Sequence, residues 1–487
     1  MRDMKDKPNI LLILTDQHRL SAIGAYGRTP CQTPNLDRLA AAGTRFETTY
    51  TTCPLCSPAR ATVMTGNWPH RHGITANINN MTSACHALPD TPDMLPRRLQ
   101  ALGYRTGYTG KWHLGETAEG DRLGKFEAPW PHQESMPEDF GFDGQNFPGH
   151  GSGGFHYPEY RQYLQENGWK HETINGELTG PEESSVPYFL ASHTMSLIDQ
   201  YADDDQPFFI WHNFWGPHGP YLAPREYNDV YRDMELPPWP NYDWPSRQIP
   251  GPHQAKINPQ HESMTWADDW QPRLRRYYAF TTLIDAQVGR LMQHLEDKGI
   301  ADNTIIMFTA DHGETCGSHG GLIDKGYHHF EEIQRIPLLA CGPGVEVGAV
   351  REEFASLADV MPTVCDMAGE APGDRVQGRS LLPLLRGEPV DDWRQDIGVE
   401  FDGLNQCACT LRTLRHGRYK YGLNVVHKDE LYDLDMDPFE TRNVIDHPAY
   451  RVIARDMRER LFTWLAESDD QALCLLRGKQ AYYNTEL

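Results

Sequence analysis

The sequence NILLILTDQH, residues 9–18, carries the clearest indication of the fold. Its first six residues form an almost wholly apolar run, which is typical of a β-strand buried on both faces of a parallel sheet. The run leads into Asp16, Gln17 and His18, whose side chains can bind a metal ion or exchange a proton. In open α/β sheets, ligands bind at the carboxyl ends of the strands. The stretch therefore predicts a strand that brings functional residues to such an edge.

Three later β-like runs repeat this arrangement. They end in the clusters Lys111-Trp112-His113, Gly216-Pro217-His218 and Asp311-His312-Gly313-Glu314. One such cluster alone would be explained equally well by a surface loop, but four at four predicted strand ends would not. Helical patterns lie between the runs, as in alternating β and α units. We therefore predict a large doubly wound, mostly parallel α/β sheet flanked by helices.

Two helices are indicated by their boundary residues. One is expected between Thr33 and Gly43 and another between Thr91 and Gly103, each with proline after the threonine. Proline suits a first helical turn, and glycine suits a helix end.

The pattern changes after about Gly369, where a connector, short strand-like pieces and a final helix follow. We therefore expect a catalytic α/β domain at residues 1–370 and a smaller C-terminal α+β domain at 371–487. Two long irregular segments, residues 117–168 and 219–261, are expected to form lids or pocket walls.

The net charge of the chain disfavours some classes of binding partner. The 487 residues include 45 Lys and Arg against 68 Asp and Glu, a formal net charge of −23, which disfavours binding to nucleic acid or to anionic membranes. No apolar run is long enough to span a membrane, and the N-terminal residues do not resemble a secretion signal. We therefore expect a cytoplasmic protein whose ten scattered cysteines are reduced.

Cys56 lies at the mouth of a predicted helix. Ser57 is expected to cap this helix, Pro58 to occupy its first turn and Gly66 to end it. A helix N-terminus attracts anions, and Arg60 lies one turn inside. The spacing of Cys53 and Cys56 suits a redox pair or half a zinc site, but no second pair at zinc-finger spacing accompanies it.

The motif Cys56-Ser57-Pro58-Ala59-Arg60 followed by ATVMTG resembles the signature of the type I sulfatases, within the alkaline phosphatase superfamily. The resemblance extends along nearly the whole chain, through PNILLILTDQ, GYTGKWHLG, MPEDFGFD, TADHGETCGSHGGLIDKGYHHFEE, SLADVMPTVCDMAG, QGRSLLPLL and ELYDLDMDPFETRNVI. It implies that a maturation enzyme oxidises Cys56 to formylglycine, an aldehyde that hydrates to a gem-diol. Cys53 is then a bystander.

The resemblance also implies one divalent metal ion, bound by Asp16, Gln17, Asp311, His312 and the oxygen derived from Cys56. The family more often has Asp in place of Gln17 and Asn in place of His312. Oxygen ligands suit Ca²⁺, whereas an imidazole shifts the preference toward Mn²⁺. We therefore rank Ca²⁺ first and Mn²⁺ second. An alternative is that His312 contacts the substrate without binding the metal.

In the implied mechanism, a gem-diol oxygen attacks sulfur and expels the alcohol, after which the second hydroxyl is deprotonated and sulfate leaves. Arg60 assists the nucleophile, and His113 takes the second proton.

Four further residues are assigned to the substrate. Lys111 and Lys325 would neutralise the sulfate oxygens, and His218 would protonate the leaving alcohol. Asn77 is a weaker candidate for a substrate contact.

Two other functions remain open. Phosphonate monoester hydrolases and phosphodiesterases share this fold and the formylglycine, and some carry Gln and His at the same metal positions. Those enzymes, however, tend to have other residues at the positions of Lys111 and His113, so the presence of both residues favours sulfate esters. The second alternative is a non-catalytic protein that binds sulfated sugars.

The leaving group is not indicated by the sequence: a sugar, an aryl group and choline all fit. We expect a small anionic sulfate ester as substrate. The N-terminal residues do not resemble a secretion signal, so a polymer outside the cell is not the expected substrate. The tail GKQAYYNTEL, residues 478–487, is a candidate contact in a homo-oligomer.

Overall fold

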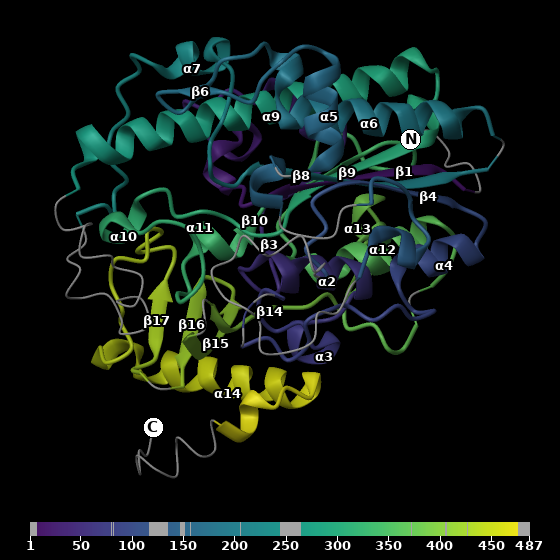
Figure 1. Cartoon of the computed structure of the whole chain (residues 1–487). Coiled ribbons are helices and arrows are strands. Elements are labelled where there is room, and N and C mark those ends of the chain that lie inside the picture. Colours follow the sequence, from purple (N-terminus) through teal and green to yellow (C-terminus); the bar gives the residue numbers. More distant parts are fainter. Residues whose placement is uncertain are drawn as a thin grey trace.

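The computed structural model describes residues 7–78, 80, 82–115, 135–146, 151–155, 157–204, 206–243, 264–371, 373–404, 407–425 and 427–475. An eight-stranded sheet, in the order β12-β2-β11-β9-β1-β8-β4-β5, crosses the larger part of the molecule (Figure 1). In that order its strands are Ala349–Arg351, Thr44–Phe46, Leu338–Cys341, Thr304–Ala310, Asn9–Asp16, Phe208–Pro217, Arg105–Gly110 and Asp143–Gly144. Every neighbouring pair from β9 to β5 is parallel, whereas β11 runs antiparallel to β9 and β2. The predicted fold class is confirmed.

Strand β1 lies between β9 and β8, and this central position explains why residues 10–14 are all apolar. Ile10 is in register with Ile305 on one side and Phe209 on the other. Alternate β1 side chains face opposite cores, because successive residues of a strand point to opposite faces. Leu12 packs in one core and Leu11 in the other, and both are fully buried.

Helices cover both faces of the sheet (Figure 1). The core that contains Leu12 includes residues of α2 (Cys56–Thr65), α4 (Leu95–Ala101), α12 (Val360–Met367) and α13 (Leu382–Leu385). The core that contains Leu11 includes residues of α1 (Pro34–Ala42), α5 (Pro158–Glu166), α6 (Val186–Ala202), α7 (Arg225–Tyr231) and α9 (Gln271–Asp297). The short helices are α3 (Pro69–His72), α10 (Ser318–Gly321) and α11 (Glu331–Gln334). No helix in the described part of the chain combines the length and apolarity needed to cross a bilayer.

One predicted helix boundary is confirmed and one is wrong. Helix α1 begins at Pro34 and is followed by Gly43, as predicted. Helix α4 begins at Leu95 rather than at Pro92, directly after Thr91. Thr91 instead accepts a turn hydrogen bond from the Met94 amide, and Pro96 is the proline of the first helical turn.

The C-terminal part contains an antiparallel sheet of β14 (Asp396–Leu404), β15 (Cys407–His416), β16 (Tyr419–Asn424) and β17 (Glu430–Asp433). Helix α14 (Arg451–Ser468) packs on this sheet and buries Met457, Leu461 and Leu465. The smaller sheets are β10-β3-β13 (Arg335–Ile336, Thr49–Tyr50, Ala355–Ser356) and β6-β7 (Thr173–Ile174, Glu177–Leu178). Much of the two predicted insertions (117–134, 147–150, 156 and 244–261) and the tail 478–487 lie outside the described residues.

Candidate active site

Four strand ends meet at one edge of the large sheet. Strands β9, β1, β8 and β4 are consecutive neighbours and run parallel, so their carboxyl ends lie side by side. Asp311, Asp16, His218 and Lys111 lie at these four ends. Gln17 and His113 follow β1 and β4 with φ angles of 65° and 58°, a left-handed conformation uncommon for residues other than glycine. The polar clusters predicted at the strand ends thus come together.

Helix α2 places Cys56 beside these strand ends. The helix begins at Cys56 itself and Leu55 is the residue before its first turn, so the predicted cap at Ser57 is wrong. The Ser57 hydroxyl instead accepts a hydrogen bond from the Ile78 amide, whereas Asn77 Oδ1 accepts one from the Ser57 amide at 3.1 Å. Asn77 therefore takes the capping role, because its oxygen satisfies an amide of the first turn.

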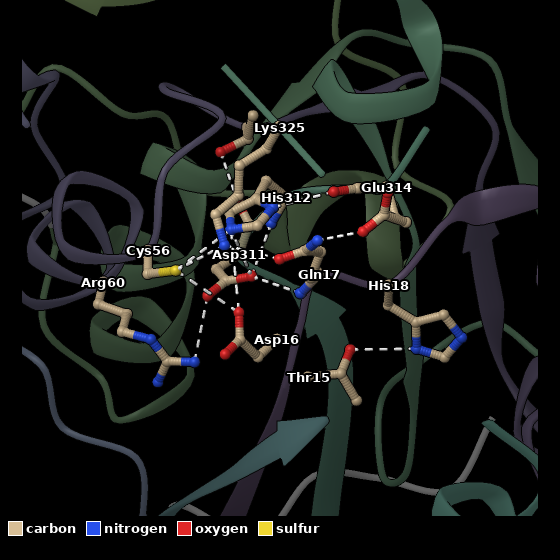
Figure 2. A network of polar contacts seen from close by, with 12 residues as sticks. Thr15, Asp16, Gln17, His18, Cys56, Arg60, Asp311, His312, Glu314 and Lys325 are labelled. Carbon is tan, nitrogen blue, oxygen red and sulfur yellow. Dashed lines mark hydrogen bonds and ion pairs between the residues drawn. The ribbon is translucent and has the colours of Figure 1, made fainter. Parts of the chain in front are cut away.

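The Cys56 sulfur is surrounded by charged side chains. Its Sγ atom lies 3.3 Å from Lys325 Nζ, 3.4 Å from His312 Nε2 and 3.6 Å from Asp16 Oδ1, as Figure 2 shows. Burial and Asp16 would raise the pKa of the thiol, but the cations of Lys111 and Lys325 and the contact with His312 hold it well below its usual range. An electron-rich group at this position is therefore favoured by its surroundings.

Two buried ion pairs lie at the same edge of the sheet. Lys111 Nζ lies 2.5 Å from Asp16 Oδ2, and Arg60 Nη2 lies 3.1 Å from Asp311 Oδ2. Arg60 Nη1 also donates to Asn213 Oδ1 at 2.9 Å. Burial alone would raise the pKa of Asp16, but Lys111, together with His218, Lys325 and Arg60, keeps it well below its usual value. These pairs hold the carboxylates in fixed orientations.

The other carboxylate oxygens fit a metal ion. The Nε2 atom of His312 lies 3.8 Å from Asp16 Oδ1 and 3.6 Å from Asp311 Oδ1, and these atoms, with Cys56 Sγ, all lie within 4.8 Å of one another. Such spacing is expected of ligand atoms placed about 2.0–2.6 Å from one cation.

The histidine of this group has a defined tautomer. His312 Nδ1 lies 3.0 Å from the Gly313 carbonyl oxygen, which can only accept, so Nδ1 carries the proton and Nε2 faces the carboxylates. Burial alone would lower the pKa of His312, but Asp311 and the contact with Cys56 together raise it above its usual value. A cation held between Nε2 and the two carboxylates would take the place of a second proton, the one on Nε2.

The remaining predicted residues surround this group. Lys325 Nζ donates to Gln17 Oε1 at 2.6 Å. His113 is buried, and burial together with Lys111 lowers its pKa. His218 donates its backbone amide to the Asp16 carbonyl and is only partly buried, so it lies toward the outside. Burial and Lys325 lower the pKa of His218.

Two further histidines near the end of α2, His70 and His72, make structural contacts outside this group. His70 contacts Glu400 and the Ser468 carbonyl, and His72 contacts Thr62.

Comparison with known families agrees with this geometry. The sequence profile of the family described as "Sulfatase" matches residues 8–370. The chain belongs to the sulfatase family. A second profile, described as "N-sulphoglucosamine sulphohydrolase, C-terminal", matches residues 317–467 of this sulfatase. The resemblance stated from the sequence is confirmed, and the protein is an enzyme of the alkaline phosphatase superfamily.

Similar proteins cover nearly the whole sulfatase chain. It is 29% identical to a Trinickia caryophylli protein named multifunctional alkaline phosphatase superfamily protein PehA, over 97% of this chain and 98% of that one. It is 28% identical to a choline-sulfatase of Rhizobium meliloti, over 96% and 89%. Among solved structures, the phosphonate monoester hydrolase of Agrobacterium radiobacter is similar with a TM-score of 0.78 and 26% identity, over 95% of this chain and 96% of that one.

Two residues of the sulfatase site had no role assigned from sequence. Asn213 binds Arg60 from within β8, and Glu314 binds Gln17. For Asn213, the available sequence signal was a polar residue within a mostly apolar predicted strand. Glu314 belonged to a recognised cluster, but its partner is 297 residues away in the sequence.

Proposed function

We propose that this sulfatase hydrolyses a small sulfate ester with a nucleophile derived from Cys56. The observation that carries the proposal is the position of the sulfur: a buried site at the start of α2 with Lys325, His312 and Asp16 within 3.6 Å. Lys111 and Arg60 add positive charge through their pairs with Asp16 and Asp311. In a chain of net charge −23, this gathering of three cationic side chains around Cys56 suits an anionic substrate.

Asp16, Gln17, Asp311 and His312 would hold the divalent cation, with Ca²⁺ ranked before Mn²⁺, and a maturation enzyme would convert Cys56 to formylglycine. When present, the cation supplies Lewis-acid polarisation of the sulfate, and the hydrated formylglycine supplies the attacking hydroxyl.

The other side chains have separate roles. Lys111 and Lys325 bind the sulfate oxygens and stabilise the charge that develops on them. Arg60 orients Asp311 and lowers the proton affinity of the nucleophile. His113 accepts a proton when the enzyme is regenerated. His218 Nδ1 contacts the Gly219 carbonyl, so we assign Nε2 as the atom that protonates the leaving oxygen.

A second candidate is the hydrolysis of phosphonate monoesters. The similarity to the phosphonate monoester hydrolase of Agrobacterium radiobacter and the ligand pair of Gln17 with His312 favour it. Lys111 and His113 favour sulfate. We therefore propose sulfate esters as the main substrates and phosphonate esters as a side activity.

The mass of the tryptic peptide Phe46–Arg60, from protein co-expressed with a formylglycine-generating enzyme, tests the nucleophile. The peptide contains Cys53 and Cys56, so Cys53 is an internal control. We expect an aldehyde at Cys56 alone and hydrolysis of sulfate esters that exceeds hydrolysis of matched phosphonate esters. Two unmodified thiols would contradict the proposed nucleophile, and a faster phosphonate reaction would favour the second candidate. A matured protein inactive on both would be a binding protein.

A further inference from the structure

Every polar atom of Gln17 makes a hydrogen bond. Its backbone amide donates to Asp311 Oδ1 at 3.0 Å, and its carbonyl accepts from the Tyr277 hydroxyl at 3.0 Å. Its side-chain Oε1 accepts from Lys325 Nζ, and its Nε2 donates to Asp324 Oδ1 at 3.1 Å and to Glu314 Oε2 (Figure 2).

The chemistry of these partners determines which way the Gln17 amide points. The Lys325 ammonium can only donate, so it must face the amide oxygen. Ionised Glu314 and Asp324 can only accept, so they must face the amide nitrogen. The amide oxygen is thereby turned toward Lys325 Nζ, which also contacts the sulfur of Cys56. That sulfur belongs to the group in which Asp16, Asp311 and His312 converge.

Glu314 is the more rigid of the two carboxylates. Its side chain is fully buried, whereas that of Asp324 is 37% exposed. Glu314 Oε1 accepts hydrogen bonds from the Asp324 amide at 2.6 Å and the Cys316 amide at 3.1 Å. The backbone carbonyl of Glu314 accepts from Arg19 Nη1 at 3.1 Å. The carboxylate therefore has a fixed position before any ligand binds.

We propose that Glu314 is a positioning residue of the metal site, which fixes the Gln17 amide with Oε1 toward the cation. This inference rests on the metal site of the proposed function. It also gives a physical reason for glutamine at position 17: an additional carboxylate there would face the carboxylates of Glu314 and Asp324, and like charges at such distances repel strongly in a buried site. The negative charge lies one hydrogen bond farther from the cation, on Glu314.

The first test is the variant Glu314→Gln in the full-length protein, with Ca²⁺ and Mn²⁺ affinities measured by titration calorimetry. The new amide nitrogen would oppose Gln17 Nε2, so Gln17 is expected to rotate and lose its ligand orientation. We expect a roughly 10- to 100-fold rise in Kd for the metal, the usual cost of losing a residue that orients a ligand. An unchanged Kd would overturn the inference.

Exchanging the two side chains, Gln17 for Glu and Glu314 for Gln, keeps one carboxylate in the pair. The effect of orientation is then separated from the effect of losing a buried charge. Gln17→Glu alone puts two carboxylates in contact and should weaken metal binding. The double variant Gln17→Glu/Glu314→Gln restores a donor opposite an acceptor and should bind the metal more tightly than either single variant. Additive losses in this cycle would overturn the inference. Gln17→Glu also leaves the hydrogen bonds of Glu314 to the backbone in place, so the cycle still has a reference if Glu314→Gln folds poorly.

Glu430→Gln is the matched control. Glu430 is also fully buried, but it lies in β17 and accepts hydrogen bonds from Asn424 and Tyr432. It should keep the wild-type metal Kd even if the protein is less stable. For Glu314→Gln, excess metal should restore kcat, which it would not do for a merely unfolded fraction. If the wild-type protein itself bound neither cation, the metal site of the proposed function would fail, an outcome distinct from a variant that binds like the wild type.

Discussion

Lys111 Nζ lies 2.5 Å from Asp16 Oδ2, and neither side chain reaches solvent. A buried ion pair of this kind is costly to break, because the remaining charge has neither water nor a partner. Asp16 also belongs to the group that fits a cation. The stability of the fold and the occupancy of the metal site are therefore expected to depend on each other.

The variant Lys111→Met should lower the free energy of unfolding by about 3–5 kcal/mol, the usual cost of removing one partner from a buried pair. Added Ca²⁺ or Mn²⁺ should recover part of this loss, because a bound cation would neutralise Asp16. Denaturant titration with and without metal measures both effects. Arg394→Met is the control: Arg394 pairs with the buried Asp359, outside the active site, so metal should not offset its loss. An equal response to metal in both variants would contradict this coupling.

Asn77→Ala separates a structural role from a substrate contact. Because Asn77 Oδ1 accepts from the Ser57 amide, we expect a loss of about 1 kcal/mol in unfolding free energy with an unchanged KM for the sulfate ester. Asn77→Asp, which keeps the acceptor, should retain the stability. A large rise in KM in the alanine variant, without loss of stability, would instead indicate a substrate contact.

The proposed role of His218 as proton donor predicts that the effect of its removal depends on the leaving group. An alkyl alcohol needs a proton as it leaves, whereas nitrophenolate does not. His218→Ala should therefore lower kcat/KM for an alkyl sulfate by about 10²- to 10⁴-fold and for 4-nitrophenyl sulfate far less. Steady-state kinetics on the two esters is sufficient. Equal losses on both would argue against proton donation by His218.

Asp285 links stability to pH away from the active site. Its carboxylate accepts hydrogen bonds from the Asn35 and Leu36 amides at the start of α1, and burial raises its pKa from 3.8 to about 6. Because the folded-state pKa is the higher one, the stabilising contribution of the protonated acid is complete below pH 3.8 and is lost as the pH rises through about 6.

Relative to the wild type, Asp285→Asn should therefore gain roughly 1–2 kcal/mol of unfolding free energy between pH 5 and pH 7.5, measured by urea denaturation. A difference between the two proteins that stays constant over this range would contradict the raised pKa.

The sequence predicts much of the fold because parallel strands buried on both faces leave continuous apolar runs, and residues 9–14 are one of them. The polar residues after such strands follow from the same rule, so the meeting of Asp16, Lys111, His218 and Asp311 was accessible before any coordinates.

Contacts made by tertiary packing were not accessible. Both Pro92 and Pro96 suit a first helical turn. The helix begins at Leu95, next to the second proline, and buries Leu95 and Leu99 in the core. The capping of Ser57 by Asn77 and the contact between Gln17 and Glu314 join segments 20 and 297 residues apart. No local pattern encodes such distances.

All ten residues of α2 are buried, from Cys56 to Thr65. A second protein cannot bind that segment once the chain has folded and the sheet and helices bury it. An enzyme that alters Cys56 must therefore work on the nascent or unfolded polypeptide, in competition with folding. The fraction of active molecules is then set during synthesis, and a purified batch that folded too early cannot be repaired by later incubation with the modifying enzyme.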